Sequence, residues 1–125
     1  MANRPWTNEE EVALTRAWLE VQDNRQATGD AGRDKWQRVS TQFHLYSGSN
    51  PPRNMDMITS KWRSLKRDMV EWNRIYEGNE TGFDLPELTL KDAQKEWADS
   101  HSGVKFKHED SWTLAKFHPG RTRLF

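Results

Sequence analysis

The sequence predicts an all-α fold, and three observations lead to that prediction. Apolar residues recur every three or four positions along most of the chain, which is the period of one face of a helix. No stretch alternates convincingly between apolar and polar residues, as a half-buried strand would. Seven Trp and five Phe in 125 residues offset a charged content of 30%, so we expect a folded domain with a sparse, Trp-dominated core.

The first helix is expected from about Asn8 to Val21. Thr7 and Glu10 stand three positions apart just before an apolar run, which is the spacing of a capping box. The run consists of Leu14, Ala17, Trp18 and Val21. Trp6 precedes the cap, where it would act as a hydrophobic staple.

A polar, Gly-containing connection, NRQATGDAGRD, separates this helix from a second one. The second helix is marked by Trp36, Val39, Phe43 and Tyr46. Pro51 and Pro52 follow it, and they end it because two adjacent prolines cannot continue a helix and disfavour helical geometry in the residue before them.

The strongest periodicity in the chain predicts a long third helix. Its apolar residues are spaced 3, 4, 3, 4, 3 and 4, and they are Met55, Ile58, Trp62, Leu65, Met69, Trp72 and Tyr76. This stripe defines about six turns, and Asn54 is the expected N-cap. The segment EGNETGFDLPE then ends the helix.

Two shorter helices complete the expected fold. Thr89, followed by Asp92, predicts the start of a fourth helix, which carries Leu90, Ala93 and Trp97. After a turn, a last helix begins near His108, with Glu109 and Asp110 in its first turn. We expect a small satellite core in this region, made by Trp97, Phe106 and Trp112.

The formal net charge is zero, with 19 basic and 19 acidic residues, but the charges are unevenly distributed. The first segment is acidic through Glu9, Glu10, Glu11 and Glu20. The stretch SKWRSLKRDM, Ser60–Met69, places four basic residues around one Trp, and Arg53 precedes it. From Glu77 onward acids again exceed bases. Only the middle segment is therefore expected to attract a polyanion.

The basic side chains of this segment can be placed on the third helix. At about 100° per residue, the face opposite the apolar stripe holds Ser60, Arg63, Ser64 and Arg67, with Arg74 and Glu71 further along and Lys61 and Lys66 on its flanks. Arg can donate a bidentate pair to guanine, Ser can approach a base edge closely, and flanking Lys can meet phosphates. Asp68 and Glu71 would repel phosphate and limit contact to the first half of the helix. A merely solvated outer face is the competing interpretation.

Other functional classes are disfavoured. The four His residues show no metal-ligand spacing, and the chain has no Cys for a disulfide or a thiolate zinc site. No P-loop or nucleophile elbow is present, so we expect no enzyme, no cofactor and no small-molecule substrate. No apolar run reaches 18 residues, so we expect no membrane span, and the start MANRPWTNEEE lacks the apolar region of a secretory signal.

Three segments, RPWTNEEEVALTRAWLEV, DKWQRVSTQF and ITSKWRSLKRDMVEWNRIY, resemble a Myb/SANT-like trihelix DNA-binding domain. A later segment, DAQKEWADSHSGVKFKHEDSWTLAKFHP, brings the resemblance closest to plant Myb-like proteins derived from PIF/Harbinger transposons. It spans about Arg4 to Pro119. That group is often labelled "glutathione S-transferase T3-like", but an all-α chain of this length has no thioredoxin-like half to hold glutathione.

The resemblance implies an architecture and a set of residues. A three-helix, helix-turn-helix type core would occupy 1–77, a helical extension packed on it 78–118, and a tail that we expect to be disordered 119–125. The core would contain Trp6, Trp18, Trp36 and Trp62, and the apolar stripe adds Leu65 and Trp72. By position in the family, bases would be read by Thr59, Ser60, Arg63 and Ser64, and Arg67 shares their face. Phosphate contacts are assigned to Arg53, Lys61 and Lys66.

The resemblance also implies a function: sequence-specific binding of double-stranded DNA in the nucleus, as a transposon-derived factor or a transcription regulator. The alternative is a SANT-like protein-interaction module with little DNA affinity, whose partner would be a transposase, a histone or a regulator. Both could hold if the third helix binds DNA and the C-terminal helices dock a transposase or regulator.

Overall fold

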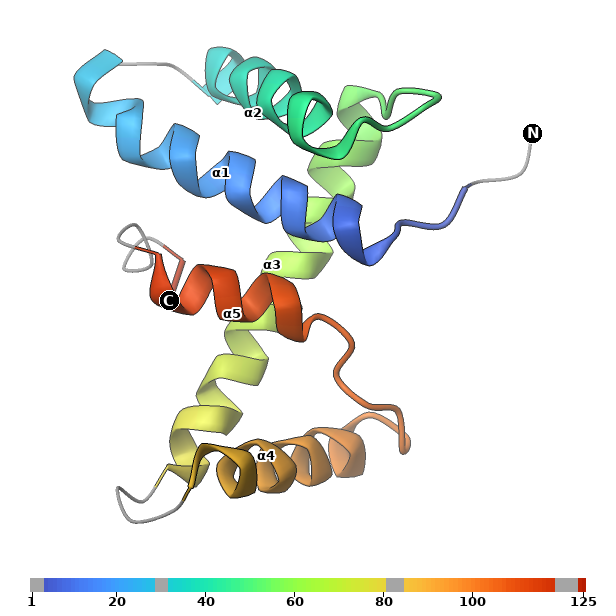
Figure 1. The fold of residues 1–125 in the computed structure, drawn as a ribbon, viewed down its shortest axis with the longest axis vertical. Helices are drawn as coiled ribbons and strands as arrows, with labels where there is room; N and C mark the ends of the chain where they lie inside the picture. The colour runs from blue at the N-terminus through green and yellow to red at the C-terminus, as the bar shows by residue number, and fades with distance from the viewer. Residues whose placement is uncertain (1–3, 29–31, 81–84, 119–123) are drawn as a thin grey trace.

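A computed structural model describes residues 4–28, 32–80, 85–118 and 124–125. In these residues the chain forms five helices and no strand, which confirms the all-α prediction. The helices are α1 (Asn8–Thr28), α2 (Gly32–Ser47), α3 (Met55–Asn79), α4 (Pro86–Ser100) and α5 (Glu109–Phe117). Figure 1 shows α1 and α2 packed together at one end of the long α3, α4 against its other end, and α5 beside α1 across its middle.

The start of α1 is fixed by the capping box that the sequence predicted. The Glu10 N–H donates to Thr7 Oγ1 at 3.1 Å, and the Thr7 N–H donates to Glu10 Oε1 at 3.1 Å. The helix ends at Thr28, seven residues beyond the predicted Val21. The reason is that no Gly or Pro interrupts the polar stretch after Val21, so the chain stays helical without an apolar stripe.

Trp6 does not act as the predicted staple. The staple partner on the helix would be the charged Glu11, and the indole instead packs on Phe43 of α2, with ring centroids 5.4 Å apart. Trp6 therefore joins the entrance of α1 to α2 and is partly buried against the core.

The long α3 begins as predicted, with the Asn54 side chain accepting from the Met57 N–H at 2.8 Å. All predicted stripe residues except Met55 are buried: Ile58, Trp62, Leu65, Met69, Trp72 and Tyr76. Met55 is 37% exposed because it lies in the first turn, at the end of the stripe.

Two aromatic groups fill the core along α3. At its first half, Trp62 stacks on Trp18 of α1 with centroids 4.9 Å apart, and Trp36 packs partly buried against the same core. At its second half, Trp72 is fully buried between three rings of the C-terminal segment: Trp97, Phe106 and Trp112. These three rings were expected to form a satellite core; they belong instead to one cluster with Trp72.

The C-terminal segment departs from the sequence prediction in two places. Helix α4 begins at Pro86, three residues before the predicted Thr89, because Pro is well suited to the first turn of a helix. Within the predicted disordered tail, residues 119–123 lie outside the described residues. Leu124 is 5% exposed and packs in the core, so disorder is the wrong prediction for this residue.

Candidate nucleic-acid interface

The outer face of α3 is open to solvent and rich in arginine. Ser60, Arg63, Arg67 and Arg74 are all exposed, and their spacing places them on one side of the helix. Neither Arg63 nor Arg74 forms an ion pair with any residue that the structure describes. Arg67 is 73% exposed, and its Nε lies 3.3 Å from the carboxylate of its neighbour Asp68. Three guanidinium groups therefore face outward on one helix side.

The hydroxyl groups predicted to read bases are not equivalent. Thr59 Oγ1 donates to the Met55 carbonyl at 3.0 Å, and Ser64 Oγ donates to the Lys61 carbonyl at 3.0 Å. Because their hydrogens are used by the helix backbone, these two oxygens can only accept from a base in this arrangement. Ser60 is exposed and has no hydrogen bond to any described residue, so it can both donate and accept.

A shallow depression of about 500 Å³ follows this face beyond the predicted contact region. Its lining residues are Arg63, Lys66, Arg67, Val70, Glu71 and Arg74. The sequence predicted that Asp68 and Glu71 would confine contact to the first half of the helix. The two acids each have a His nearby: His108 Nε2 lies 3.9 Å from Asp68, and His101 Nε2 lies 3.6 Å from Glu71. Beyond these two acids, Arg74 is exposed on the same side of α3, and the sequence-based site did not include it.

Lys66 flanks this face as predicted, and a second lysine lies near it. The Lys66 Nζ is 5.5 Å from the centroid of the Trp18 ring, and the Lys35 Nζ, from the first turn of α2, is 5.0 Å from the same ring. Sequence reasoning missed Lys35. The available signal was a cation immediately before the core residue Trp36, at the start of the helix that precedes α3.

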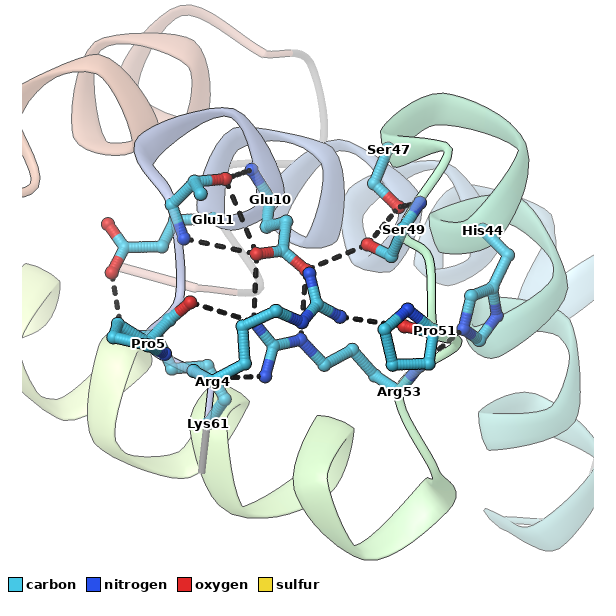
Figure 2. Close-up of polar contacts among 11 residues, drawn as sticks. Arg4, Pro5, Glu10, Glu11, His44, Ser47, Ser49, Pro51, Arg53 and Lys61 are labelled. Carbon is cyan, nitrogen blue, oxygen red and sulfur yellow. Dashed lines mark hydrogen bonds and ion pairs between the residues drawn. The ribbon is translucent and has the colours of Figure 1, made fainter. Parts of the chain in front are cut away.

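Arg53, which the sequence-based assignment gave to phosphate contact, is bound inside the chain. Figure 2 shows its guanidinium enclosed by the chain's own oxygens. Its Nε and Nη2 each lie 2.9 Å from a carboxylate oxygen of Glu10, while Nη1 and Nη2 donate to the carbonyls of Arg4 and Pro5. The side chain is 3% exposed and lies over the Trp6 ring. Arg53 therefore clamps the entrance of α1 to the turn before α3.

The clamp sets the protonation state of Glu10. The hydrogen bonds from Arg53 outweigh the burial of the carboxylate and lower its pKa from 4.5 to about 2. The Ser49 hydroxyl adds a further hydrogen bond at 2.7 Å. Glu10, which the sequence placed in an acidic segment and in a capping box, is thus a buried anion paired with a buried cation.

Lys61 also forms an ion pair within the chain. Its Nζ lies 2.7 Å from Glu11 Oε2, and the side chain is only 18% exposed. Glu11 has a second partner, His108 Nδ1, at 2.8 Å. Although burial raises the pKa of Glu11, the contacts with His108 and Lys61 bring it below its ordinary value. Lys61, which was predicted to contact phosphate, thus takes part in a link among α3, α1 and the start of α5.

The fold and this face define a helical domain of helix-turn-helix type with an arginine-rich third helix. Residues 3–111 match the family model of the Myb/SANT-like DNA-binding domain, and the chain belongs to that family. The match runs through α4 into α5, while the division predicted at residue 77 stays a prediction. Neither the curated proteins nor the solved structures that were compared gave a match.

Two further observations bear on other functional classes. None of the helices among residues 4–28, 32–80 and 85–118 is long and apolar enough to cross a membrane. Over the same part of the chain, no group of three or more His, Cys, Asp or Glu residues could hold a metal ion.

Proposed function

We propose that this chain binds double-stranded DNA with a preference for particular sequences, and that it does so by placing the outer face of α3 in the major groove. The observation that carries the proposal is the contrast among its basic residues. Arg53 and Lys61 are held by Glu10 and Glu11, whereas Arg63 and Arg74 have no ion-pair partner among the described residues. The outward arginines are therefore available for an external polyanion.

The position of each residue along α3 determines whether we assign it to bases or to phosphates. Arg63 and Arg74 are eleven residues apart, which corresponds to about 16 Å along the helix axis. In helix-turn-helix proteins the N-terminal residues of the recognition helix contact base edges, and Arg74 lies far beyond that part of α3. We assign Ser60, Arg63 and Arg67 to the bases and Arg74 to the phosphate backbone at the groove edge. Lys66 and Lys35 would contact phosphates on the other flank.

The hydroxyl geometry narrows what can be read. Ser60 can meet either a donor or an acceptor on a base edge, because its hydroxyl group is not used by the helix. Thr59 and Ser64 would accept from donors such as the amino groups of adenine or cytosine. A preferred site rich in guanine follows for Arg63 and Arg67, since Arg pairs bidentately with guanine.

A salt titration of DNA affinity tests this proposal. Three phosphate contacts predict that log K falls against log salt with a slope of about −3. Fluorescence anisotropy with a labelled duplex would compare the wild-type chain with Arg63→Ala and Arg67→Ala. Lys91→Ala, on the exposed surface of α4, is the matched control for loss of one positive charge. The role of α3 would be refuted if Lys91→Ala lowered duplex affinity as much as the arginine variants do. It would also be refuted if duplex affinity did not change with salt concentration.

Sequence preference needs a separate experiment. Selection of bound duplexes from random oligonucleotides would define a preferred site. Arg63→Ala should then cost roughly 1–3 kcal/mol on that site and relax the preference at one base pair. If the loss is the same on every duplex, Arg63 contacts phosphate. If no duplex is enriched and none binds, the SANT-like protein-interaction module is the better description.

The cellular part of the proposal depends on the resemblance to plant transposon-derived Myb-like proteins. A nuclear factor of transposon origin, or a transcription regulator, is the role we propose on that ground. Imaging of a fluorescent fusion to the chain tests the location: accumulation outside the nucleus would contradict it. Chromatin profiling of the same fusion would show whether bound sites contain the motif selected in vitro.

A further inference from the structure

A second hollow lies on the opposite end of the molecule from α1 and α2. It has a volume of about 450 Å³ and runs between α4 and the segment that leads to α5. Its lining residues are Glu87, Leu90, Lys91, Gln94, Lys95, Ala98, Gly103, Lys105 and Glu109. We call it the α4 groove. The DNA-binding proposal makes no use of it, since none of these residues belongs to α3.

The wall of the α4 groove is fixed in place by hydrogen bonds. The Gln94 side chain accepts from the Phe106 N–H at 3.0 Å and donates to the Phe106 carbonyl at 3.1 Å, so it holds the linking segment against α4. The Phe106 ring stacks on Trp72 with centroids 4.4 Å apart and an interplanar angle of 2°. Because both the side chain and the backbone of Phe106 are anchored, the groove is formed before any partner arrives.

The charges around the groove favour a negatively charged partner. Lys91, Lys95 and Lys105 converge on it from α4 and from the linking segment. None of the three forms an ion pair with a carboxylate in the described part of the chain. Of the two acids in the lining, Glu109 accepts a hydrogen bond from Gln94 at 3.3 Å. Three lysines therefore outnumber the acids at a hollow whose floor includes the apolar side chains of α4.

Three of the four acids of α4 lie away from the groove, and the fourth, Glu87, is in its lining. At about 100° per residue, Asp92, Glu96 and Asp99 project from the side of α4 opposite Gln94. Although acids exceed bases from Glu77 onward, the groove itself presents mainly positive charge. Because the groove lies on the Gln94 side of α4, Lys91 and Lys95 face it, while their sequence neighbours Asp92, Glu96 and Asp99 face away.

We propose that the α4 groove binds an acidic, partly apolar segment of a partner protein. An apolar side chain of that segment would rest on Leu90 and Ala98, and its carboxylates would pair with the three lysines. DNA is the less suitable occupant because the floor is apolar and Glu87 and Glu109 lie in the lining. A basic segment is disfavoured by the lysines themselves.

The test uses the full chain and a defined probe. The probe is a labelled peptide in which Leu recurs at helical spacing among Glu residues, and its counterpart carries Lys in place of every Glu. The Glu peptide should bind saturably in an anisotropy titration and the Lys peptide should not. Chemical-shift changes in an amide NMR spectrum should cluster on α4 and residues 103–107. Lack of saturable binding, or shifts centred on α3, would overturn the proposal.

Variants connect the binding to the groove. The pair Lys91→Glu with Lys95→Glu should weaken the Glu peptide about tenfold, since each surface pair contributes modestly. Lys107→Glu, an exposed residue outside the lining, makes the same kind of change and should have little effect. Lys105→Glu provides a second groove variant from a different segment, should the α4 pair reduce folding. Equal effects of Lys107→Glu and the groove variants would contradict the assignment.

Two further measurements test whether the groove is instead occupied by DNA or by a second copy of this chain. If the α4 pair lowers duplex affinity as much as Arg63→Ala does, the groove belongs to the DNA footprint and the proposal fails. If sedimentation shows self-association of the wild-type chain that the α4 pair abolishes, the occupant is a second copy of this chain and the proposal fails. A monomer with unchanged duplex affinity and weakened peptide binding supports it.

Discussion

The Glu10–Arg53 clamp offers a sharp quantitative test of the fold. Glu10→Gln removes the charge while Gln can still serve the capping box, so the change isolates the ion pair. The pKa of Glu10 is about 2 instead of 4.5. Because one pKa unit corresponds to about 1.4 kcal/mol, the clamp should contribute about 3 kcal/mol to stability at neutral pH. Glu9→Gln is the matched control, since Glu9 is exposed in the same turn; it should cost less than about 1 kcal/mol.

The pH dependence of this difference has a defined sign. The pKa of Glu10 is lower in the folded chain than in the unfolded one, so its contribution is complete above about pH 4.5. It is lost as the pH falls from 4.5 towards 2, because the carboxylate is then protonated in both states. The stability gap between the wild-type chain and Glu10→Gln should therefore narrow steadily over this range.

Urea unfolding followed by Trp fluorescence measures this gap at pH 7 and at pH 3. Two outcomes would refute the reasoning. One is that Glu10→Gln and Glu9→Gln have equal unfolding free energies at pH 7. The other is that the gap between the wild-type chain and Glu10→Gln is as large at pH 3 as at pH 7.

Four further predictions follow from the same contacts. Trp62→Ala should cost roughly 3–5 kcal/mol of unfolding free energy, because a buried ring stacked on another Trp is removed; unchanged melting would contradict the assigned core. Asn54→Ala should cost about 1 kcal/mol in urea unfolding through loss of the α3 cap. Asp68→Asn should raise duplex affinity in anisotropy by roughly two- to fivefold, since it frees Arg67 and removes a repelling charge, whereas weaker binding would argue against DNA contact near this residue. Arg53→Lys should lower thermal stability but leave the duplex affinity of the folded chain unchanged; a selective loss of affinity would restore Arg53 as a phosphate contact.

The parts of the fold that sequence reasoning predicted correctly depend on residues close together in the chain. The capping box of Thr7 and Glu10 and the Asn54 cap are contacts across three residues, and the stripe of α3 repeats within one helix. Such contacts can be predicted from the sequence because the period of the helix alone determines which nearby residues are adjacent.

The contacts of Arg53 and Lys61 that sequence reasoning did not foresee involve partners that are distant in sequence. Arg53 meets Glu10 across 43 positions, and Lys61 meets Glu11 across the same junction of α1 and α3. In the sequence, Arg53 precedes a basic run and Lys61 lies in it, so both were predicted to contact phosphate, whereas Glu10 and Glu11 stand in an acidic segment far away. Only the packing of α1 on α3 shows that the two runs neutralise each other where they touch. The outward residues Arg63, Arg67 and Arg74 could be placed by helical angle. The sequence could not show that Arg63 and Arg74 have no ion-pair partner among the described residues.

The central claim is that the outward side of α3 is where a duplex binds. Amide NMR spectra of the full chain, recorded during titration with the duplex selected from random oligonucleotides, test it most directly. We predict that the largest shift changes fall on residues 59–74 and that α4 changes little. Saturable changes centred on the acidic start of α1 or on α4, with α3 unaffected, would contradict it.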